Sequence, residues 1–194
     1  MRLPARPTPR PVLAARHSAQ RGVSLVIVLL FLIILTLLGV SASMTSLSSE
    51  RLARNARDQN IALQAAEAAL RDARTDIGQT RGLSGRTGAS ADCSVSGYKG
   101  FCLPADSGSP VWDLQLENPD HSVQLGEITG AKTLPGASTP GGVSKQPRYI
   151  IEALPDVFEG SLRAGSTTIV YRVTAMGYGS NPDTRVMLQE VVRF

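Results

Sequence analysis

The side chains that could do chemistry are few in this sequence. The chain has two cysteines, Cys93 and Cys102, which excludes a dense disulfide scaffold and a four-thiolate zinc site but allows one disulfide bond. It has two histidines, His17 and His121, which leaves little room for a histidine-rich metal site. Neither a nucleophile motif nor a glycine-rich phosphate loop accompanies His121. We therefore expect a solvated loop histidine, and a protein that is not an enzyme.

Three carboxylates stand at positions that suggest a role. Glu67 lies in the apolar segment AAEAAL, where it could be a buried acid, but Arg71 follows four residues later and favours a surface ion pair. Glu117 and Asp120 flank Asn118 and could bind calcium, but they lack the spacing of a calcium-binding loop. We expect no metal and no cofactor.

The positive charge is concentrated at the beginning of the chain. Residues 1–22 hold five arginines and no acid, and without these five charges the formal net charge falls from +4 to −1. The remainder has only three lysines, Lys99, Lys132 and Lys145. Because no basic patch is visible outside the first segment, we predict no binding of nucleic acid.

A long apolar run follows this basic segment. No charged residue occurs from Val23 to Ser49, and residues 23–44 are long enough to cross a bilayer as a helix. The arginines before the run predict a cytoplasmic N-terminus, which places everything after about residue 45 outside the inner membrane. The alternative is a secretory signal over residues 1–42, with a small-residue site at Val40-Ser41-Ala42.

The predicted compartment bears on the two cysteines. Outside the inner membrane thiols are oxidised, so Cys93 and Cys102 can form a disulfide across a short loop. Closing that loop would stabilise the fold by about 2–3 kcal/mol. Two unpaired thiols are the alternative.

The helix is predicted to continue beyond the membrane, over residues 23–79. No proline occurs between Pro11 and Pro104, and residues 40–77 contain no glycine. Mostly apolar residues recur there at alternating spacings of four and three, as on a helix that packs along its length. This stripe comprises Leu52, Ala56, Gln59, Leu63, Ala66, Leu70, Ala73 and Ile77. Its partner could be the chain's own domain or another subunit.

The rest of the chain predicts a small sheet that this helix covers. Residues 80–147 are rich in glycine and proline and predict loops, with one half-buried strand at Trp112, Leu114 and Leu116. Residues 148–194 predict an antiparallel sheet. Its strands are 148–154, 167–179 and 184–194, the last two forming a hairpin. The fold class is α+β, with a long N-terminal helix packed on a small sheet.

Three segments resemble the PilX-type minor pilins of type IV pili. They are QRGVSLVIVLLFLIILTLLGVSA (20–42), RNARDQNIALQAAEAALRDA (54–73), and the ending YRVTAMGYG (171–179) with TRVMLQEVV (184–192). The resemblance implies cleavage by a prepilin peptidase between Gly22 and Val23, with methylation of the new amino terminus. It further implies that the other minor pilins and the major pilin are partners.

The sequence departs from the pilin pattern at two positions. Pilins commonly have Phe first after the cut, where this chain has Val23. They also have a glutamate five residues into the mature chain, which is thought to meet the amino terminus of the next subunit, and this chain has Ile27 there. A subunit without that glutamate suits the filament tip better than repeated incorporation.

Three functions are compatible with the sequence. The first is a minor pilin that primes pilus assembly and sits at or near the tip, first in the inner membrane with its head in the periplasm and then in the extracellular pilus. The second is a pseudopilin of a type II secretion system. The third is a single-pass anchored or secreted binding protein with no role in a filament.

Overall fold

The structure, a computed structural model, describes residues 23–156 and 169–193. The predicted leader 1–22, including Gly22, lies outside the described residues. The chain divides into two compact units, Met1–Glu50 and Arg51–Phe194, and each is considered by itself.

One helix provides the described part of the first unit and the beginning of the second. Helix α1 runs from Val23 to Thr75, and a π-helical turn, η1, continues from Asp76 to Thr80. These bounds agree with the helix expected over residues 23–79. The helix ends because Gly82 adopts a left-handed conformation with φ of 58°, which allows the Leu83 N–H to donate to the Ile77 carbonyl at 2.8 Å.

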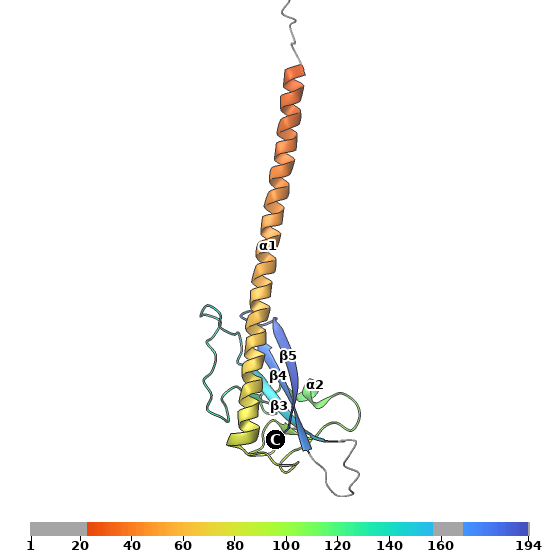
Figure 1. Ribbon diagram of the computed structural model, residues 1–194, viewed down its shortest axis with the longest axis vertical. Helices are drawn as coiled ribbons and strands as arrows, with labels where there is room; N and C mark the ends of the chain where they lie inside the picture. Colours follow the sequence, from red (N-terminus) through yellow and green to blue (C-terminus); the bar gives the residue numbers. More distant parts are fainter. Residues whose placement is uncertain (1–22, 157–168, 194) are drawn as a thin grey trace, which may run out of the picture. The chain divides into compact units, whose positions relative to one another are not determined.

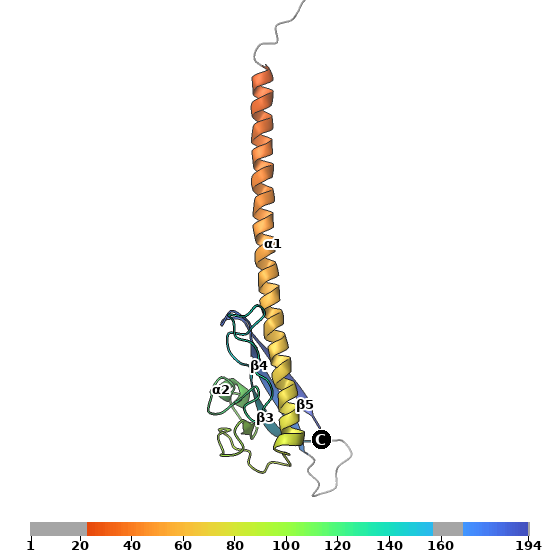
Figure 2. The same ribbon diagram turned by 90° about the vertical axis from the view of Figure 1, so that its left-hand side faces the viewer.

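The head, in the second unit, contains a five-stranded mixed sheet (Figures 1 and 2). Its strands are β1 (Phe101–Cys102), β2 (Val123–Gln124), β3 (Arg148–Pro155), β4 (Ile169–Tyr178) and β5 (Arg185–Val192). The order is β1-β3-β4-β5, and β2 also pairs with β3. Strand β4 is antiparallel to both β3 and β5, as expected, but β1 runs parallel to β3. The sheet is therefore not purely antiparallel, and two of its strands come from the region expected to be loops.

The strand predicted at Trp112–Leu116 is wrong, because this segment forms a short helix, α2 (Val111–Gln115). Pro110 stands at its N-cap in an extended conformation, so its fixed φ starts the helix without costing a hydrogen bond. Burial follows a helical period: Val111 and Leu116 are buried, whereas Leu114 is 62% exposed. The apparent alternation in the sequence covered too few residues to distinguish the two periods.

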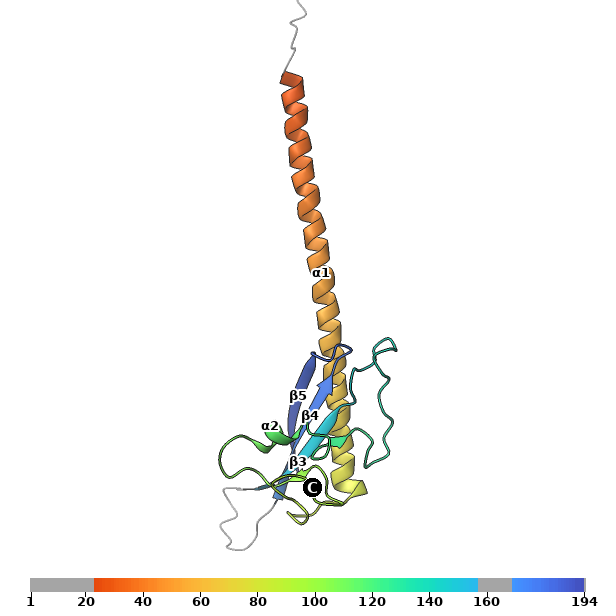
Figure 3. The same ribbon diagram turned by 180° about the vertical axis from the view of Figure 1, so that it is seen from behind.

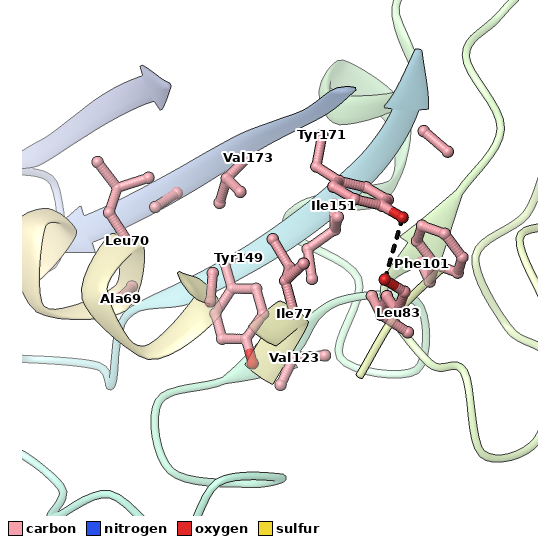
Figure 4. Close-up of a cluster of buried hydrophobic side chains, with 13 residues drawn as sticks. Ala69, Leu70, Ile77, Leu83, Phe101, Val123, Tyr149, Ile151, Tyr171 and Val173 are labelled. Carbon is pink, nitrogen blue, oxygen red and sulfur yellow. Dashed lines mark hydrogen bonds between the residues drawn. The ribbon is translucent and has the colours of Figure 1, made fainter. Parts of the chain in front are cut away.

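Each face of the sheet has its own apolar cluster. The front face packs against the second half of α1, where Tyr149, Ile151, Tyr171 and Val173 meet Leu70 and Ile77 (Figure 4). The back face carries a smaller cluster, made by Cys93, Cys102, Val111, Leu116 and Ile150. Seen from behind, α2 lies over this back face (Figure 3). Burial on both faces explains why β3 is apolar nearly throughout rather than alternating.

Candidate assembly surface

The first half of α1 is apolar over its whole circumference. In the single chain its large side chains from Val23 to Met44 are exposed, and none of the residues from Val23 to Ser49 is charged. Within the described residues it is the one helix long and apolar enough to cross a membrane. A helix that is apolar all round needs an apolar environment on every side, such as lipid or neighbouring helices. This segment fits a single-pass membrane anchor.

Hydroxyl groups do not interrupt that apolar character. The Thr36 hydroxyl donates to the Ile33 carbonyl at 2.8 Å, and the Ser43 hydroxyl donates to the Gly39 carbonyl at 3.0 Å. Because each hydroxyl is satisfied by its own helix, neither needs a partner from outside.

Val23 is the first residue of α1, and Ile27, one turn later, is 51% exposed. Gly22, the other half of the predicted processing pair, lies outside the described residues.

The second half of α1 approaches the sheet through small side chains. Its fully buried alanines are Ala62, Ala65, Ala66, Ala69 and Ala73. The closest approach is at Gly177 in β4, where a Cβ atom would lie 2.1 Å from the Ala62 carbonyl oxygen and 2.3 Å from the Ala66 nitrogen. Only glycine fits there, because both obstructing atoms belong to the helix backbone.

The buried face of α1 begins later than the predicted stripe. Ala66, Leu70, Ala73 and Ile77 are buried as expected for residues that cover the sheet. Leu52 is 66% exposed and Ala56 is also exposed, so neither covers the sheet in this chain, and Leu63 is half-buried. The prediction that the stripe covers the sheet from Leu52 onward is corrected to a cover that begins at Ala62. Periodicity could not locate this beginning, because it records which residues share a face and not how far the partner extends.

Two aspartates on α1 fix the helix to the loops of the head. The Asp58 carboxylate accepts the Ser180 N–H at 2.6 Å, beside Gly179. The buried Asp72 accepts the Gly126 N–H at 2.9 Å and the Thr129 hydroxyl. Each carboxylate thus accepts a hydrogen bond from a loop N–H group that would otherwise need water as its acceptor.

Asp76 is the centre of a buried polar group. It is fully buried, pairs with Arg81 through two hydrogen bonds, and accepts the Tyr149 hydroxyl at 2.9 Å. Arg81 in turn donates to the Lys99 carbonyl at 2.9 Å. Burial, together with the Asp76 carboxylate, raises the pKa of the Tyr149 phenol above its usual value of 10.0, so the phenol remains a proton donor. The group ties the end of the helix to β3.

The two cysteines form a disulfide bond. Cys93 and Cys102 are both fully buried, with Cα atoms 4.6 Å apart. Cys102 belongs to β1, and Cys93 adopts a left-handed conformation with φ of 61°. The bond holds the loop on the back face of the sheet, next to Ile150.

The other residues considered from the sequence have ordinary surface positions. Glu67 is exposed on α1. Glu117 forms an exposed ion pair with Arg185, and the half-buried His121 bonds to Gln115. Within residues 23–156 and 169–193, no group of acidic, histidine and cysteine side chains could hold a metal ion.

Sequence reasoning missed Gly177, Asp72 and Asp76. A glycine within a strand is a signal of close backbone approach, and Gly177 could have been found in this way. The two aspartates stand four residues apart beside the alanine stripe, but nothing local distinguishes them from solvated acids.

Two family models match this chain, and together they cover most of it. The PilX N-terminal model matches residues 21–71, and the model for the C-terminal part of type IV pilus assembly protein PilX matches residues 98–194, which is half of the chain. This chain belongs to the PilX family of type IV pilus assembly proteins. No curated protein and no solved structure matches it.

The two matches divide the PilX-family chain between the long helix and the sheet of the head. The N-terminal match contains the apolar half of α1 and most of the alanine face, and the C-terminal match contains the whole five-stranded sheet. Asp72, Asp76 and Cys93 lie between the matches. The chain is thus a component of type IV pilus assembly, with one part suited to a membrane and another suited to a folded head.

Proposed function

We propose that this PilX-family protein is a minor pilin that primes pilus assembly and is incorporated at or near the tip of the filament. One observation carries the proposal: α1 is charge-free and apolar from Val23 to Met44, with its large side chains exposed there, and it has Ile27 where pilins have a glutamate. Such a helix can bundle with the helices of other minor pilins in the membrane, which lowers the barrier to starting a filament.

The missing carboxylate supports a terminal position. In a filament of repeated subunits, a glutamate at this place offsets the buried amino terminus of the next subunit, because an unpaired buried charge is costly. Ile27 offers no such partner. A subunit at the tip has no neighbour above it, and it therefore loses less from the substitution than a subunit in the shaft.

The proposal includes a route to the filament. The N-terminus lies in the cytoplasm and the head in the periplasm until a prepilin peptidase cuts between Gly22 and Val23; the protein then leaves the inner membrane with the extracellular pilus. The intact mass and N-terminal sequence of the protein from its own host test this route. A methylated Val23 at the amino terminus supports it, and Gly22→Glu should leave the protein unprocessed in the membrane. Normal piliation by that variant would contradict the proposal.

The position in the filament requires a second experiment. Ile27→Glu restores the carboxylate, and we expect it to raise the number of labelled copies along each pilus, counted by immunogold microscopy. Leu29→Glu is the matched control, because it adds the same charge at a place where no amino terminus is expected. Equal labelling by the wild type and Ile27→Glu would argue against a role for Ile27 in tip placement.

Deletion of the gene distinguishes the alternatives. A priming minor pilin predicts loss of pili and twitching, whereas a pseudopilin predicts loss of protein export through a type II secretion system. An anchored or secreted binding protein predicts neither loss, and a start near Ser43 or an intact Met1 rather than Val23.

A further inference from the structure

The two edges of the sheet differ in whether other strands cover them. Along its outer side β3 is covered by β1, which pairs at Ile151 and Glu152, and by β2, which pairs at Tyr149 and Arg148. These are strands of two residues, followed by loops, so this edge offers little to another chain. Strand β5 is the opposite edge, and among the described residues no further strand pairs with it.

The backbone of β5 has a definite outward-facing set of hydrogen-bonding groups. The Gly179 N–H donates to the Thr184 carbonyl at 2.8 Å, and alternate residues along an antiparallel ladder repeat this pairing. The residues in between therefore direct their N–H and C=O groups away from β4. They are Arg185, Met187, Gln189 and Val191.

The same four residues present their side chains on the back face, and two of them are exposed apolar residues. Met187 is 40% exposed and Val191 is 62% exposed. Next to Met187 is a groove that is also lined by apolar side chains (Trp112, Leu116 and Met176) and by charged ones (Asp113, Glu117 and Arg185). A strand added to β5 would place alternate side chains beside these residues.

Two of the usual protections of an edge strand, a bulge and a proline, are absent from β5, and its one carboxylate, Glu190, is paired with Arg74 of α1. The strand has eight residues, contains no proline, and has an unbroken register with β4. Natural edge strands of this length are often blunted by bulges or prolines, because an open apolar edge is a template for another chain.

The charges of this edge favour a partner other than a second copy. No carboxylate stands among its four outward residues, and arginines mark both ends, Arg185 at the start and Arg193 directly after the strand. Both arginines form ion pairs. The pair of Arg185 with Glu117 is exposed on both sides and is therefore weak, whereas the Asp156 side chain that pairs with Arg193 is only 14% exposed. Two copies paired antiparallel over the full length would oppose Arg185 with Arg193, which is unfavourable.

We propose that β5 is the docking edge for an extended segment of another pilus assembly protein. That segment adds a strand to the sheet, with apolar residues opposite Met187 and Val191 and carboxylates near Arg185 and Arg193. Main-chain hydrogen bonds supply affinity, and the groove beside Trp112 supplies specificity. The inference rests on membership of the PilX family and not on the priming role.

Cross-linking in the assembled system tests the register. A photoreactive amino acid is placed singly at Met187, Gln189 or Val191 of the full-length protein in its own host, with Leu114 as an equally exposed control on α2. Strand addition predicts adducts with one partner protein, and moving the probe by two residues along β5 moves the cross-linked residue by two in a constant direction. Adducts at unrelated positions, or none above the Leu114 control, would overturn the proposal, as would in-register adducts with a second copy alone.

A pair of variants tests the backbone. Gln189→Pro removes an outward N–H that β4 does not use, whereas Gln189→Thr keeps it, and both lose the bond to Thr174. We expect the proline variant to lower the cross-link yield at Val191 at least tenfold and the threonine variant to leave it unchanged. Formation of the Cys93–Cys102 disulfide reports folding of both. If the proline variant does not fold, Met187→Lys with Val191→Lys replaces it, with the probe at Gln189, and an undiminished yield from Gln189 also overturns the proposal.

These results are separable from the priming role. A deletion strain that still makes pili would refute priming, while in-register cross-links from β5 would stand. Loss of pili with no adduct from β5 would refute the docking edge alone.

Discussion

The two halves of α1 have the same secondary structure but differ in the size and exposure of their apolar side chains. From Val23 to Met44 the helix presents large apolar side chains on every side, all exposed in the single chain. From Ala62 onward it presents fully buried alanines on one face and charged residues on the other. The difference teaches what each partner requires: lipid or loosely specified helices accept any apolar surface, whereas a sheet at backbone distance accepts only small side chains.

The largest effect on the head should come from Asp76. Asp76→Ala leaves Arg81 largely buried without its carboxylate and the Tyr149 hydroxyl without its acceptor. We expect a loss of about 3–5 kcal/mol in the free energy of unfolding. Thermal unfolding of the detergent-solubilised full-length protein, followed by circular dichroism, measures it. A stable variant would mean that the helix end is held by packing alone.

Substitution of two leucines in the predicted stripe distinguishes packing within the chain from packing against another subunit. Leu70→Ala empties a buried site against the sheet and should cost about 2–5 kcal/mol. Leu52→Ala alters an exposed site and should change the stability of the head by less than about 0.5 kcal/mol. Pilus counts complete the comparison, because a loss of pili by Leu52→Ala with an intact head would place another subunit against Leu52.

Alanine in place of a glycine should destabilise the head at one position and leave it unchanged at another. Gly177→Ala forces the sheet and helix backbones apart and should destabilise the head by about 1–3 kcal/mol. Gly39→Ala meets nothing within 4 Å in the single chain and favours the helix, so head stability should be unchanged. Equal unfolding temperatures for the two variants would contradict the close approach at Gly177.

The smallest expected effect is a dependence of head stability on alkaline pH. Burial raises the pKa of Tyr149 in the folded head, whereas the unfolded phenol titrates near 10.0. The stabilisation is therefore complete below pH 10 and is lost as the pH rises above it, because only the unfolded chain releases the proton. Tyr149→Phe should flatten this decline but not remove it, because burial also raises the pKa of Tyr171 and Tyr178. An unchanged slope would mean that Tyr149 does not contribute.

Much of this architecture could be predicted from local patterns. The helix over 23–79 and the three C-terminal strands were predicted because each covers several periods of its pattern, and the disulfide because only two cysteines exist. The strand at Trp112–Leu116 was wrong because five residues give no reliable period. Strands β1 and β2 were missed because pairs of residues such as Phe101 and Cys102 have no periodicity at all.

The sequence by itself determined which residues avoid water and in what order. A charge-free run needs an apolar medium, and an alanine stripe needs a close partner, whatever the rest of the chain does. Only the tertiary structure decided where the close approach begins, that Asp72 and Asp76 are buried rather than solvated, and that β5 is the open edge of the sheet. These depend on pairing between residues far apart in the chain, such as Ala62 with Gly177, and no local pattern encodes the distance between two backbones.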